Sequence, residues 1–367
     1  MREKSLRFFL LFMALLFACS FPSVSAEEAD EITLKSETAV LVDGGTGQVL
    51  FEKDMYRRMY PASITKIMTA LLALENGKLD DVITMTRDAV FSIGRDTSHI
   101  ALDTDERLTL EEALYAMALA SANDAANGIA ELIGGTMDGF ASMMNGRAKE
   151  AGALGTNFTN AHGLFDENHY TTAYDMARIT MAAIKSPVFT KIFSTLIYEM
   201  PPTNKQREVR TFRCTNAMLT GKYKYEGVIA AKTGWINQSG NTLVTAARRN
   251  GRTLIAVVMQ SAGKNDACED TTALLDYGFS LPAEAFEPVT QATITTINTY
   301  SDVPQPDIEN RRPSALLWIF GLICIALPFC VLLRRYIIVK RHCKRKLVPY
   351  ALIPLKKDWR LWYWRIF

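Results

Sequence analysis

A run of 20 residues without a charged side chain, Ser314 to Leu333, limits how this 367-residue chain can be organised. Such a run is long enough to cross a bilayer as a helix, although a helix buried in a protein core is the alternative. Two arginines follow directly, and residues 334–367 hold 11 lysines and arginines against one acid. Because basic residues favour the cytoplasmic side, we expect a single transmembrane helix at 314–333, a basic cytoplasmic tail at 334–367 and an extracytoplasmic remainder.

Membrane lipids are therefore expected partners of this end of the chain. Three tryptophans and a tyrosine lie among the cations of the tail, between residues 359 and 364, as in segments that lie on an anionic membrane surface. A disordered tail whose charge only sets the topology explains the same composition equally well.

The first 26 residues predict export. Three basic residues precede an apolar run from Phe8 to Ala18, and small residues ending at Ala26 provide a cleavage site, as in a secretory signal peptide. The run is too short to span a bilayer. Cys19 could mark a lipoprotein signal, but the bulky Phe17 makes that interpretation weaker. We therefore expect a signal peptide at 1–26 and an exported cell-membrane protein.

Residues 27–285 are expected to form one globular domain, which is long enough for a large core. Residues 286–313 are rich in proline, threonine and acidic side chains with little periodicity, which is typical of a stalk. From Glu27 to Leu333 the chain carries 27 basic and 37 acidic residues, a net charge of −10. An acidic domain lacks the basic surface that nucleic acid requires, so no nucleic-acid partner is expected.

Strand signals lie near both ends of this domain and helical signals lie between them. Two predicted hairpins, with a glycine-rich and an Asn-Gly turn, span residues 39–51 and 241–260. The predicted helices are 64–76, 110–133 and 172–185. The pattern predicts an α+β fold in which helices cover an antiparallel β-sheet whose first and last strands meet.

Metal and disulfide chemistry have little support in the sequence. The pair His162 and His169 lies among loop residues without a metal-ligand spacing, so no metal and no other cofactor is expected. Only Cys214 and Cys268 fall in the predicted domain, where they could form one disulfide or remain free thiols.

Ser63 and Lys66 are the first candidates for catalysis. On a helix, positions i and i+3 share a face, so the Lys66 amine can reach the Ser63 hydroxyl. A serine hydroxyl is a poor nucleophile without a base, and a lysine can be that base if burial or neighbouring positive charge lowers its pKa.

Two further triplets supply polar groups. Ser121-Ala-Asn123 offers a hydroxyl for proton relay and an amide to hold a substrate backbone, although a polar turn between helices has the same composition. Lys232-Thr233-Gly234 follows an apolar strand, where a cation and a hydroxyl could bind an anionic substrate end and a glycine would admit the substrate backbone.

The order of the three motifs is more informative than any one of them. S-x-x-K, S-x-N and K-T-G occur in this order. Ser63 and Ser121 are 58 positions apart, and Ser121 and Lys232 are 111 positions apart. A second S-x-x-K at 261–264 follows K-T-G and cannot complete the order, and a second S-x-N lies at 239–241. This combination is typical of penicillin-binding proteins and class A β-lactamases.

The chain resembles the low-molecular-mass penicillin-binding proteins of the serine-type D-alanyl-D-alanine carboxypeptidase family, which trim cell-wall stem peptides. The resemblance extends from about residue 38 to 281. It is carried by YPASITKIMT at 60–69, SANDAA at 121–126, NAHGL at 160–164 and TTAYDMA at 171–177. It implies a β-lactamase/DD-peptidase-like fold for residues 27–285 and peptidoglycan stem peptides as the substrate.

The resemblance also implies a role for each motif residue. Ser63 would be acylated by the carbonyl of the penultimate D-alanine, with Lys66 as base, and Ser121 and Asn123 would assist proton transfer and hold the peptide. The implied substrate-binding residues are Lys232 and Thr233, which would face the terminal carboxylate, with Gly234 and Trp235. Backbone N–H groups of residues 63 and 235 would hold the oxyanion, and β-lactams, which mimic D-alanyl-D-alanine, would trap the same site.

Two departures from the family pattern matter. Many members carry a β-rich second domain, whereas here a short stalk would hold the catalytic domain close to the bilayer. Many also end in an amphipathic surface helix, whereas here a transmembrane helix is expected. An arginine that helps to bind the substrate carboxylate in some members is not evident, and Arg252, near the second predicted hairpin, is the nearest candidate.

Two alternatives remain open at this stage. A β-lactamase needs a deacylating glutamate in a loop, and Asp166 and Glu167 lie in such a segment, but their neighbours match the carboxypeptidase loop. A non-catalytic wall-binding or β-lactam-sensing protein is the second alternative, and the complete set of motif residues argues against it.

Overall fold

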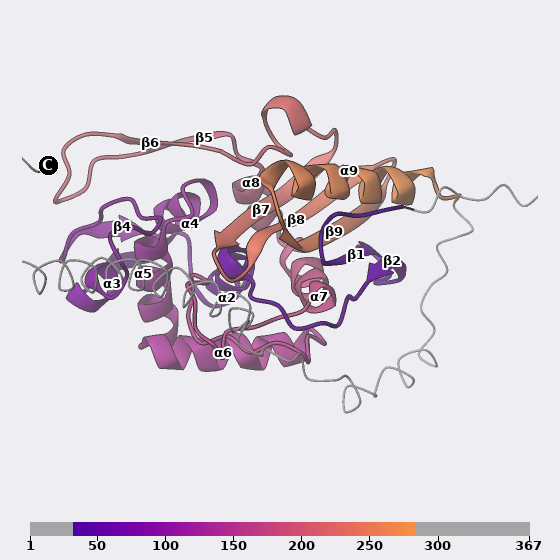
Figure 1. The fold of residues 1–367 in the computed structure, drawn as a ribbon. Coiled ribbons are helices and arrows are strands. Elements are labelled where there is room, and N and C mark those ends of the chain that lie inside the picture. Colours follow the sequence, from indigo (N-terminus) through magenta and orange to yellow (C-terminus); the bar gives the residue numbers. More distant parts are fainter. Residues whose placement is uncertain (1–31, 283–367) are drawn as a thin grey trace, which may run out of the picture. The chain divides into compact units, whose positions relative to one another are not determined.

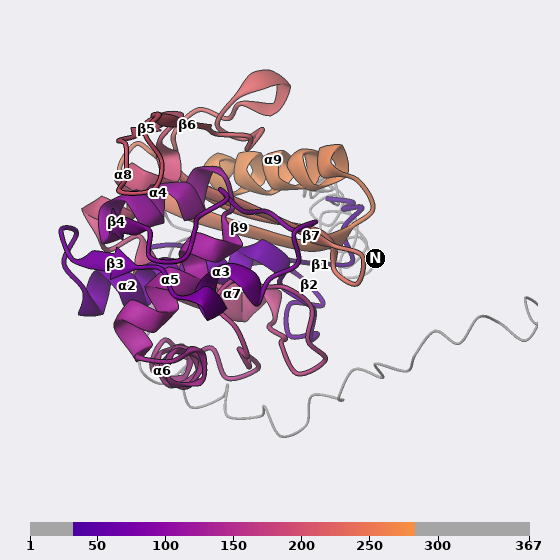
Figure 2. The ribbon, with the colours of Figure 1, turned by 90° about the vertical axis from the view of Figure 1, so that its left-hand side faces the viewer.

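The structure is a computed structural model that describes residues 32–282 (Figures 1 and 2). The predicted signal peptide, stalk, transmembrane helix and tail lie outside these residues. Within residues 32–282 no helix combines the length and the apolar character needed to cross a membrane.

Strands lie near both ends of the described chain, and most of the helices lie between them. The strands are β1 (Thr38–Asp43), β2 (Val49–Lys53), β3 (Val82–Thr84), β4 (Arg107–Thr109), β5 (Ile197–Met200), β6 (Arg210–Arg213), β7 (Val228–Ile236), β8 (Gly240–Arg249) and β9 (Arg252–Ser261). The α-helices are α2 (Lys66–Asn76), α3 (Arg87–Phe91), α4 (Leu110–Leu119), α5 (Asn123–Gly134), α6 (Met137–Glu150), α7 (Ala173–Ala183), α8 (Pro187–Ser194) and α9 (Lys264–Ser280). Two 3₁₀ turns are η1 (Ala62–Thr65) and η2 (Gly221–Tyr223).

A five-stranded antiparallel sheet in the order β2-β1-β9-β8-β7 forms the centre of the fold. The pairing of β1 with β9 confirms that strands from the two ends of the domain meet. The β8–β9 hairpin turns at Asn250 and Gly251, which both have positive φ, as the predicted Asn-Gly turn requires. Strand β7, which carries Lys232-Thr-Gly, is an edge strand, so one side of it is open to a ligand.

Alternating residues of the central strands face two separate cores. Val40 and Val257 pack on one face with residues of α2, α4, α5 and α7, whereas Leu41 and Val258 pack on the other with Leu274 of α9. Figure 1 shows the same layers, with α9 on one side of the sheet and α7 on the other. Both faces of β1 and β9 are covered, and the middle of each strand is accordingly an uninterrupted apolar run, 39–42 in β1 and 254–259 in β9.

The predicted helix 110–133 is wrong as a single element. Helix α4 begins with a capping box between Thr109 and Glu112 and ends at Leu119, and α5 begins only at Asn123. Between them Ser121 has a φ of 54°, a left-handed conformation that ends a helix. The predicted helices 64–76 and 172–185 are confirmed, although the first starts as the 3₁₀ turn η1.

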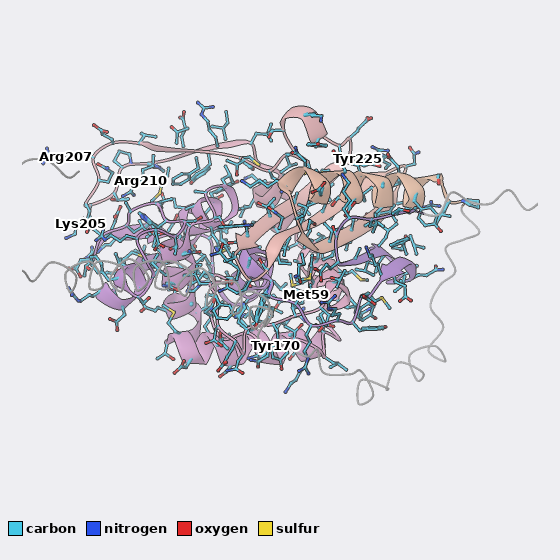
Figure 3. The ribbon with its side chains drawn as sticks, in the orientation of Figure 1. Met59, Tyr170, Lys205, Arg207, Arg210 and Tyr225 are labelled. Atoms are coloured by element: carbon cyan, nitrogen blue, oxygen red, sulfur yellow. The ribbon has the colours of Figure 1, made fainter. Side chains whose placement is uncertain are left out.

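An arm formed by β5 and β6 is held at its tip by a buried acid, a feature that the sequence analysis did not predict. Glu106, whose side chain is 1% exposed, accepts hydrogen bonds from Arg210 Nη1 at 2.7 Å and Thr203 Oγ1 at 2.6 Å. The Arg210 guanidinium lowers the pKa of the Glu106 carboxyl, against the opposing effect of burial. Figure 3 shows Lys205, Arg207 and Arg210 near the tip of this arm.

Candidate active site

Ser63 lies in a turn that the neighbouring strands hold in place. The residue before it, Ala62, has a φ of 50°, a strained conformation for a residue with a side chain. Thr242 Oγ1 of β8 donates a hydrogen bond of 3.0 Å to Pro61 O. A Cβ atom at Gly234 would lie 2.8 Å from Ser63 N, so only glycine lets β7 approach the nucleophile this closely.

The Lys66 amine makes three short contacts. Its Nζ lies 2.7 Å from Asn123 Oδ1, 2.7 Å from the His162 carbonyl oxygen and 3.1 Å from Ser63 Oγ. A neutral amine has two N–H groups and one lone pair, and the two oxygens at 2.7 Å can only accept. The lone pair of a neutral Lys66 therefore faces the Ser63 hydroxyl, which can donate its proton to it.

Burial favours the neutral form of Lys66. The side chain is completely buried on the first turn of α2. Loss of solvent lowers its pKa well below the ordinary value, the charge of Lys232 lowers it further, and Asp124 opposes both effects. A lysine can act as a base only if its pKa is lowered in this way, and burial is the main cause here.

The loop 160–164 completes the surroundings of Lys66, and the sequence analysis assigned no role to it. Asn160 Oδ1 accepts hydrogen bonds from the backbone N–H groups of His162 and Gly163, which fixes the loop. Thr69 Oγ1 donates to Ala161 O at 2.6 Å. Gly163 has a φ of 86°, and a Cβ there would lie 1.9 Å from the carbonyl oxygen of residue 62.

Two buried histidines support this loop in their neutral form. His169 Nδ1 accepts a hydrogen bond from Thr159 N, so its proton resides on Nε2, which donates to Thr65 Oγ1 at 2.9 Å. Burial, with a smaller effect of Lys66, lowers the pKa of His169 to about 3, and burial also lowers that of His162. Among residues 32–282 no cluster of side chains could hold a metal ion.

Ser121 and Lys232 form a second group of polar atoms. Lys232 Nζ donates to Ser121 Oγ at 3.1 Å and to Thr233 O at 2.9 Å. Burial lowers the pKa of Lys232 to about 8. Asp124, at the start of α5, accepts hydrogen bonds from the N–H groups of residues 100 and 102 and thereby orders the segment that carries Ser98.

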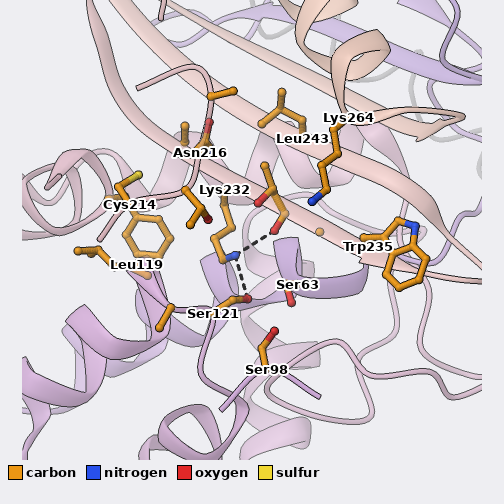
Figure 4. Close-up of a pocket in the computed structure, with 18 of the residues that line it drawn as sticks. Ser63, Ser98, Leu119, Ser121, Cys214, Asn216, Lys232, Trp235, Leu243 and Lys264 are labelled. Carbon is orange, nitrogen blue, oxygen red and sulfur yellow. Dashed lines mark hydrogen bonds between the residues drawn. The ribbon is translucent and has the colours of Figure 1, made fainter. Parts of the chain in front are cut away.

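Both groups meet at a cavity of about 540 Å³ (Figure 4). It is lined by 118–121, 211–217, 231–235 and 241–243, with Ser63, Ser98, Ile192, Phe193, Thr195, Lys264, Ala267 and Cys268. Ser63, Ser121 and Lys232 face the same space in Figure 4, and Trp235, which is 59% exposed, lies at its rim. No aspartate or glutamate of the described chain lines the cavity, and Asp166 and Glu167 are not part of it.

The structure answers two questions that the sequence left open, the position of Arg252 and the state of the two cysteines. Arg252 does not reach the cavity: it begins β9 and donates to the carbonyl oxygens of residues 278 and 281. Eight positions of β8 separate the Arg249–Arg252 pair from Asn241, roughly 27 Å along the strand. Cys214 and Cys268 are both free thiols, and both line the cavity.

A serine, a buried lysine amine and a cationic edge strand around one cleft define a serine hydrolase of the acyl-transfer type. Comparison with known proteins identifies the family. The chain belongs to the D-alanyl-D-alanine carboxypeptidase family, peptidase S11, whose family pattern matches residues 23–263.

Individual relatives agree with this family. D-alanyl-D-alanine carboxypeptidase DacF of Bacillus subtilis is 35% identical over 274 residues, which cover 73% of this chain and 68% of that protein. The D-alanyl-D-alanine carboxypeptidase of Streptomyces sp. (strain K15) is 29% identical, over 73% of this chain and 95% of that protein. The crystal structure of a D-alanyl-D-alanine carboxypeptidase from Mycobacterium tuberculosis has a TM-score of 0.64 and 27% identity, over 71% of this chain and 96% of that chain.

The rate of Ser63 acylation is expected to show a bell-shaped dependence on pH. As pH rises through the lowered pKa of Lys66, the amine becomes neutral and can accept a proton, so the rate increases. Above about pH 8 Lys232 loses the positive charge that attracts an anionic substrate, so the rate decreases. The rate constant for acylation by a fluorescent penicillin, measured from about pH 5 to about pH 10, tests this. A rate that still rises at the alkaline end contradicts it.

Proposed function

We propose that this chain removes the terminal D-alanine from peptidoglycan stem pentapeptides through an acyl-enzyme on Ser63. The observation that carries the proposal is the contact of buried Lys66 Nζ with Ser63 Oγ, where Ser63 lines the same cleft as Lys232 and Thr233 of the edge strand. Ser63 is the nucleophile of this cleft with Lys66 as its base, and Lys232 provides positive charge for a substrate carboxylate.

The first half of the reaction follows from these positions. Ser63 Oγ attacks the carbonyl carbon of the penultimate D-alanine, and its proton passes to Lys66 Nζ. The carbonyl oxygen becomes an oxyanion that the backbone N–H groups of Ser63 and Trp235 stabilise. The amide C–N bond then breaks, the leaving nitrogen takes the proton held by Lys66 through a relay at Ser121, and free D-alanine departs from Lys232 and Thr233, which leaves Lys66 neutral.

The second half regenerates the enzyme. A water molecule gives a proton to Lys66 and attacks the ester carbonyl, and the shortened peptide leaves as Ser63 recovers its proton. A β-lactam acylates the same serine, but its ring opening leaves no departing group. Since no carboxylate of the described chain lines the cavity to activate water in the β-lactamase manner, we expect a long-lived penicilloyl enzyme and not rapid turnover.

One experiment tests this function directly. The full-length chain and its Ser63→Ala variant are incubated with diacetyl-L-lysyl-D-alanyl-D-alanine while free D-alanine is measured. We expect release by the wild type and none above background by the variant, with a single stoichiometric acylation by penicillin. Equal release by both proteins, or rapid hydrolysis of a chromogenic cephalosporin, contradicts the proposal.

The placement of the enzyme is a separate proposal that rests on the sequence alone. A signal peptide at 1–26 would export the chain, and residues 314–333 would hold it in the membrane, with the basic tail at 334–367 against the inner lipid surface. The stalk 286–313 would keep the catalytic domain near the outer face of the bilayer. Protease treatment of intact cells, which should digest the domain and spare the tail, tests this arrangement.

A further inference from the structure

The chain leaves the catalytic domain at the end of the sheet that is remote from the cavity. Arg252, in the β8–β9 turn, donates hydrogen bonds through Nη1 to the carbonyl oxygens of Gly278 and Leu281, at 3.4 and 3.0 Å. The last turn of α9 is thus held beside the β8–β9 turn, whereas its first turn lines the cavity. Residues 283–313, 31 in number, then lead to the predicted transmembrane helix. The β8–β9 turn therefore adjoins the point from which the chain continues toward the predicted membrane segment.

This turn is rich in arginine and is fixed to the helix end. Residues 248–252 read RRNGR, with three arginines in five positions. The guanidinium carbon of Arg249 lies 4.1 Å from the ring centroid of Tyr225 and 5.0 Å from that of Phe279 in α9. Arg249 Nε also donates to Glu226 O at 3.0 Å. These contacts, together with those of Arg252, join the turn and the end of α9 into one surface.

Cations outnumber acids on this surface. The charged residues of the turn and of the described segments that adjoin it, 43–47, 224–227 and 276–281, are Lys224, Arg248, Arg249 and Arg252 against Asp43, Glu226 and Asp276. Asp43 is buried and accepts three hydrogen bonds within its own turn, and Arg178 adds a cation beside that turn. The next acids along the chain, Glu284 and Glu287, lie outside the described residues.

A local excess of positive charge is unusual in this part of the chain, which carries a net charge of −10 from residue 27 to residue 333. Arg248, Lys224 and Asn250 are exposed, so the charge faces solvent and not the core. We call this surface, formed by 248–252 with Lys224 and the last turn of α9, the basic end of the domain.

We propose that the basic end binds the surface of an anionic lipid bilayer, with the turn 248–252 against the lipid phosphates. The inference rests on the proposed placement of the chain at the membrane and goes beyond the proposed reaction. A guanidinium group suits this role because its N–H groups match two oxygens of one phosphate. Nearby cations add to the attraction, which acts within a Debye length of the lipid surface.

Docking in this way sets the position of the active site. Eight positions of β8, roughly 27 Å along the strand, separate the turn from Asn241 at the cavity. The cleft is then held at the end of the sheet away from the lipid, where it meets peptides of the wall in preference to peptides at the membrane surface.

The test uses the full-length chain in lipid nanodiscs and hydroxyl-radical footprinting, which oxidises side chains according to their exposure to solvent. The ratio of oxidation at half-buried Phe279, beside the turn, to that at Trp235, at the rim of the cavity, measures docking without a label. We expect this ratio to fall when phosphatidylglycerol replaces phosphatidylcholine in the nanodisc. It should recover at about 1 M salt, where the Debye length is about 3 Å.

A double variant, Lys224→Gln with Arg248→Gln, tests the charge of the basic end. It removes two exposed cations and leaves the contacts of Arg249 with Phe279 in place. Each cation contributes roughly a fivefold preference for an anionic surface. The double variant should therefore lose most of the protection of Phe279 in phosphatidylglycerol nanodiscs.

Lys205→Gln with Arg207→Gln is the matched control. It also removes one exposed lysine and one exposed arginine, but at the tip of the arm, which Figure 3 shows on the opposite side of the view from Tyr225. This variant should keep the protection of Phe279. Both double variants should be acylated at Ser63 at the wild-type rate, because none of the four changed side chains lines the cavity.

The inference is overturned if the oxidation ratio is the same in the two lipids, or if the control variant loses the protection to the same extent. Protection that is already present in detergent without lipid also overturns it, since a contact between copies of the chain would be the cause. If the chain does not enter the nanodisc, the proposed placement fails by itself. The basic end is then judged with added phosphatidylglycerol vesicles, where the fall in the ratio and its loss in the Lys224→Gln, Arg248→Gln variant must still appear.

Discussion

Replacement of Lys66 by arginine is expected to slow acylation of Ser63 by about a thousandfold. A guanidinium stays protonated at any pH at which the protein is folded, so it offers no lone pair to the serine hydroxyl. The amine of Lys66, in contrast, lies 3.1 Å from Ser63 Oγ, and burial lowers its pKa. The rate constant for labelling by a fluorescent penicillin measures the effect, together with D-alanine release.

Two controls separate chemistry from folding in this experiment. Lys66→Met fills a similar volume without a base and should be as slow as the arginine variant, and both should keep a cooperative thermal transition. Lys78→Arg changes an exposed lysine just after the same helix and should keep full activity. An arginine variant that acylates within tenfold of the wild type would show that Lys66 is not the base.

The second large effect is expected for Gly163→Ala, which places a methyl group against the turn that carries the nucleophile. The added Cβ would lie 1.9 Å from the carbonyl oxygen of Ala62, at a φ of 86°. Relief of this overlap requires the loop to move, and the His162 carbonyl moves away from Lys66 with it. We expect acylation to fall about a hundredfold and the free energy of unfolding to fall by at least about 2 kcal/mol.

Gly146→Ala is the matched control for this substitution. Gly146 lies inside α6, and a Cβ there would have no atom within 4 Å. The helical position favours alanine, so this variant should gain about 0.5–1 kcal/mol of stability and keep wild-type acylation. Urea unfolding and penicillin labelling measure both quantities. If Gly163→Ala matched Gly146→Ala in both, the loop would not position the catalytic lysine.

Much of the fold follows from local patterns. The two hairpins and the helices at 64–76 and 172–185 depend on short-range periodicity and turn residues, and each is confirmed. The meeting of the first and last strands, which was predicted from the order of the elements along the chain, is also confirmed. The helix at 110–133 was predicted too long because both halves are apolar with helical spacing. Its interruption depends on the backbone of Ser121 and on a hydrogen bond from Asn123 N to Ser98 O, which lies far away in the sequence.

The candidate site was predictable as a set of residues, but only in part as a mechanism. Lys66 lies within hydrogen-bond distance of Ser63, as the i, i+3 spacing predicts. The Asn123 amide oxygen, which was expected to hold a substrate backbone, contacts the same amine, and the sequence did not predict that contact. The carbonyl of His162 and the role of Gly163 were not predictable, because a backbone oxygen and an absent side chain leave no chemical signature in a sequence. Lys264 was set aside as part of a second S-x-x-K, and only the path of α9 brings it to the cavity.

By itself the sequence determined the class of chemistry, through three motifs in a fixed order and a serine three residues before a lysine. It also determined that β1 and β9 could be buried on both faces, since an uninterrupted apolar run is unfavourable in contact with water. Only the tertiary structure determined the protonation state of the Lys66 amine. The pKa of Lys66 depends on burial and on the charge of Lys232, which lies 166 residues away in the chain. Burial and charge act through space, so only the folded chain specifies them.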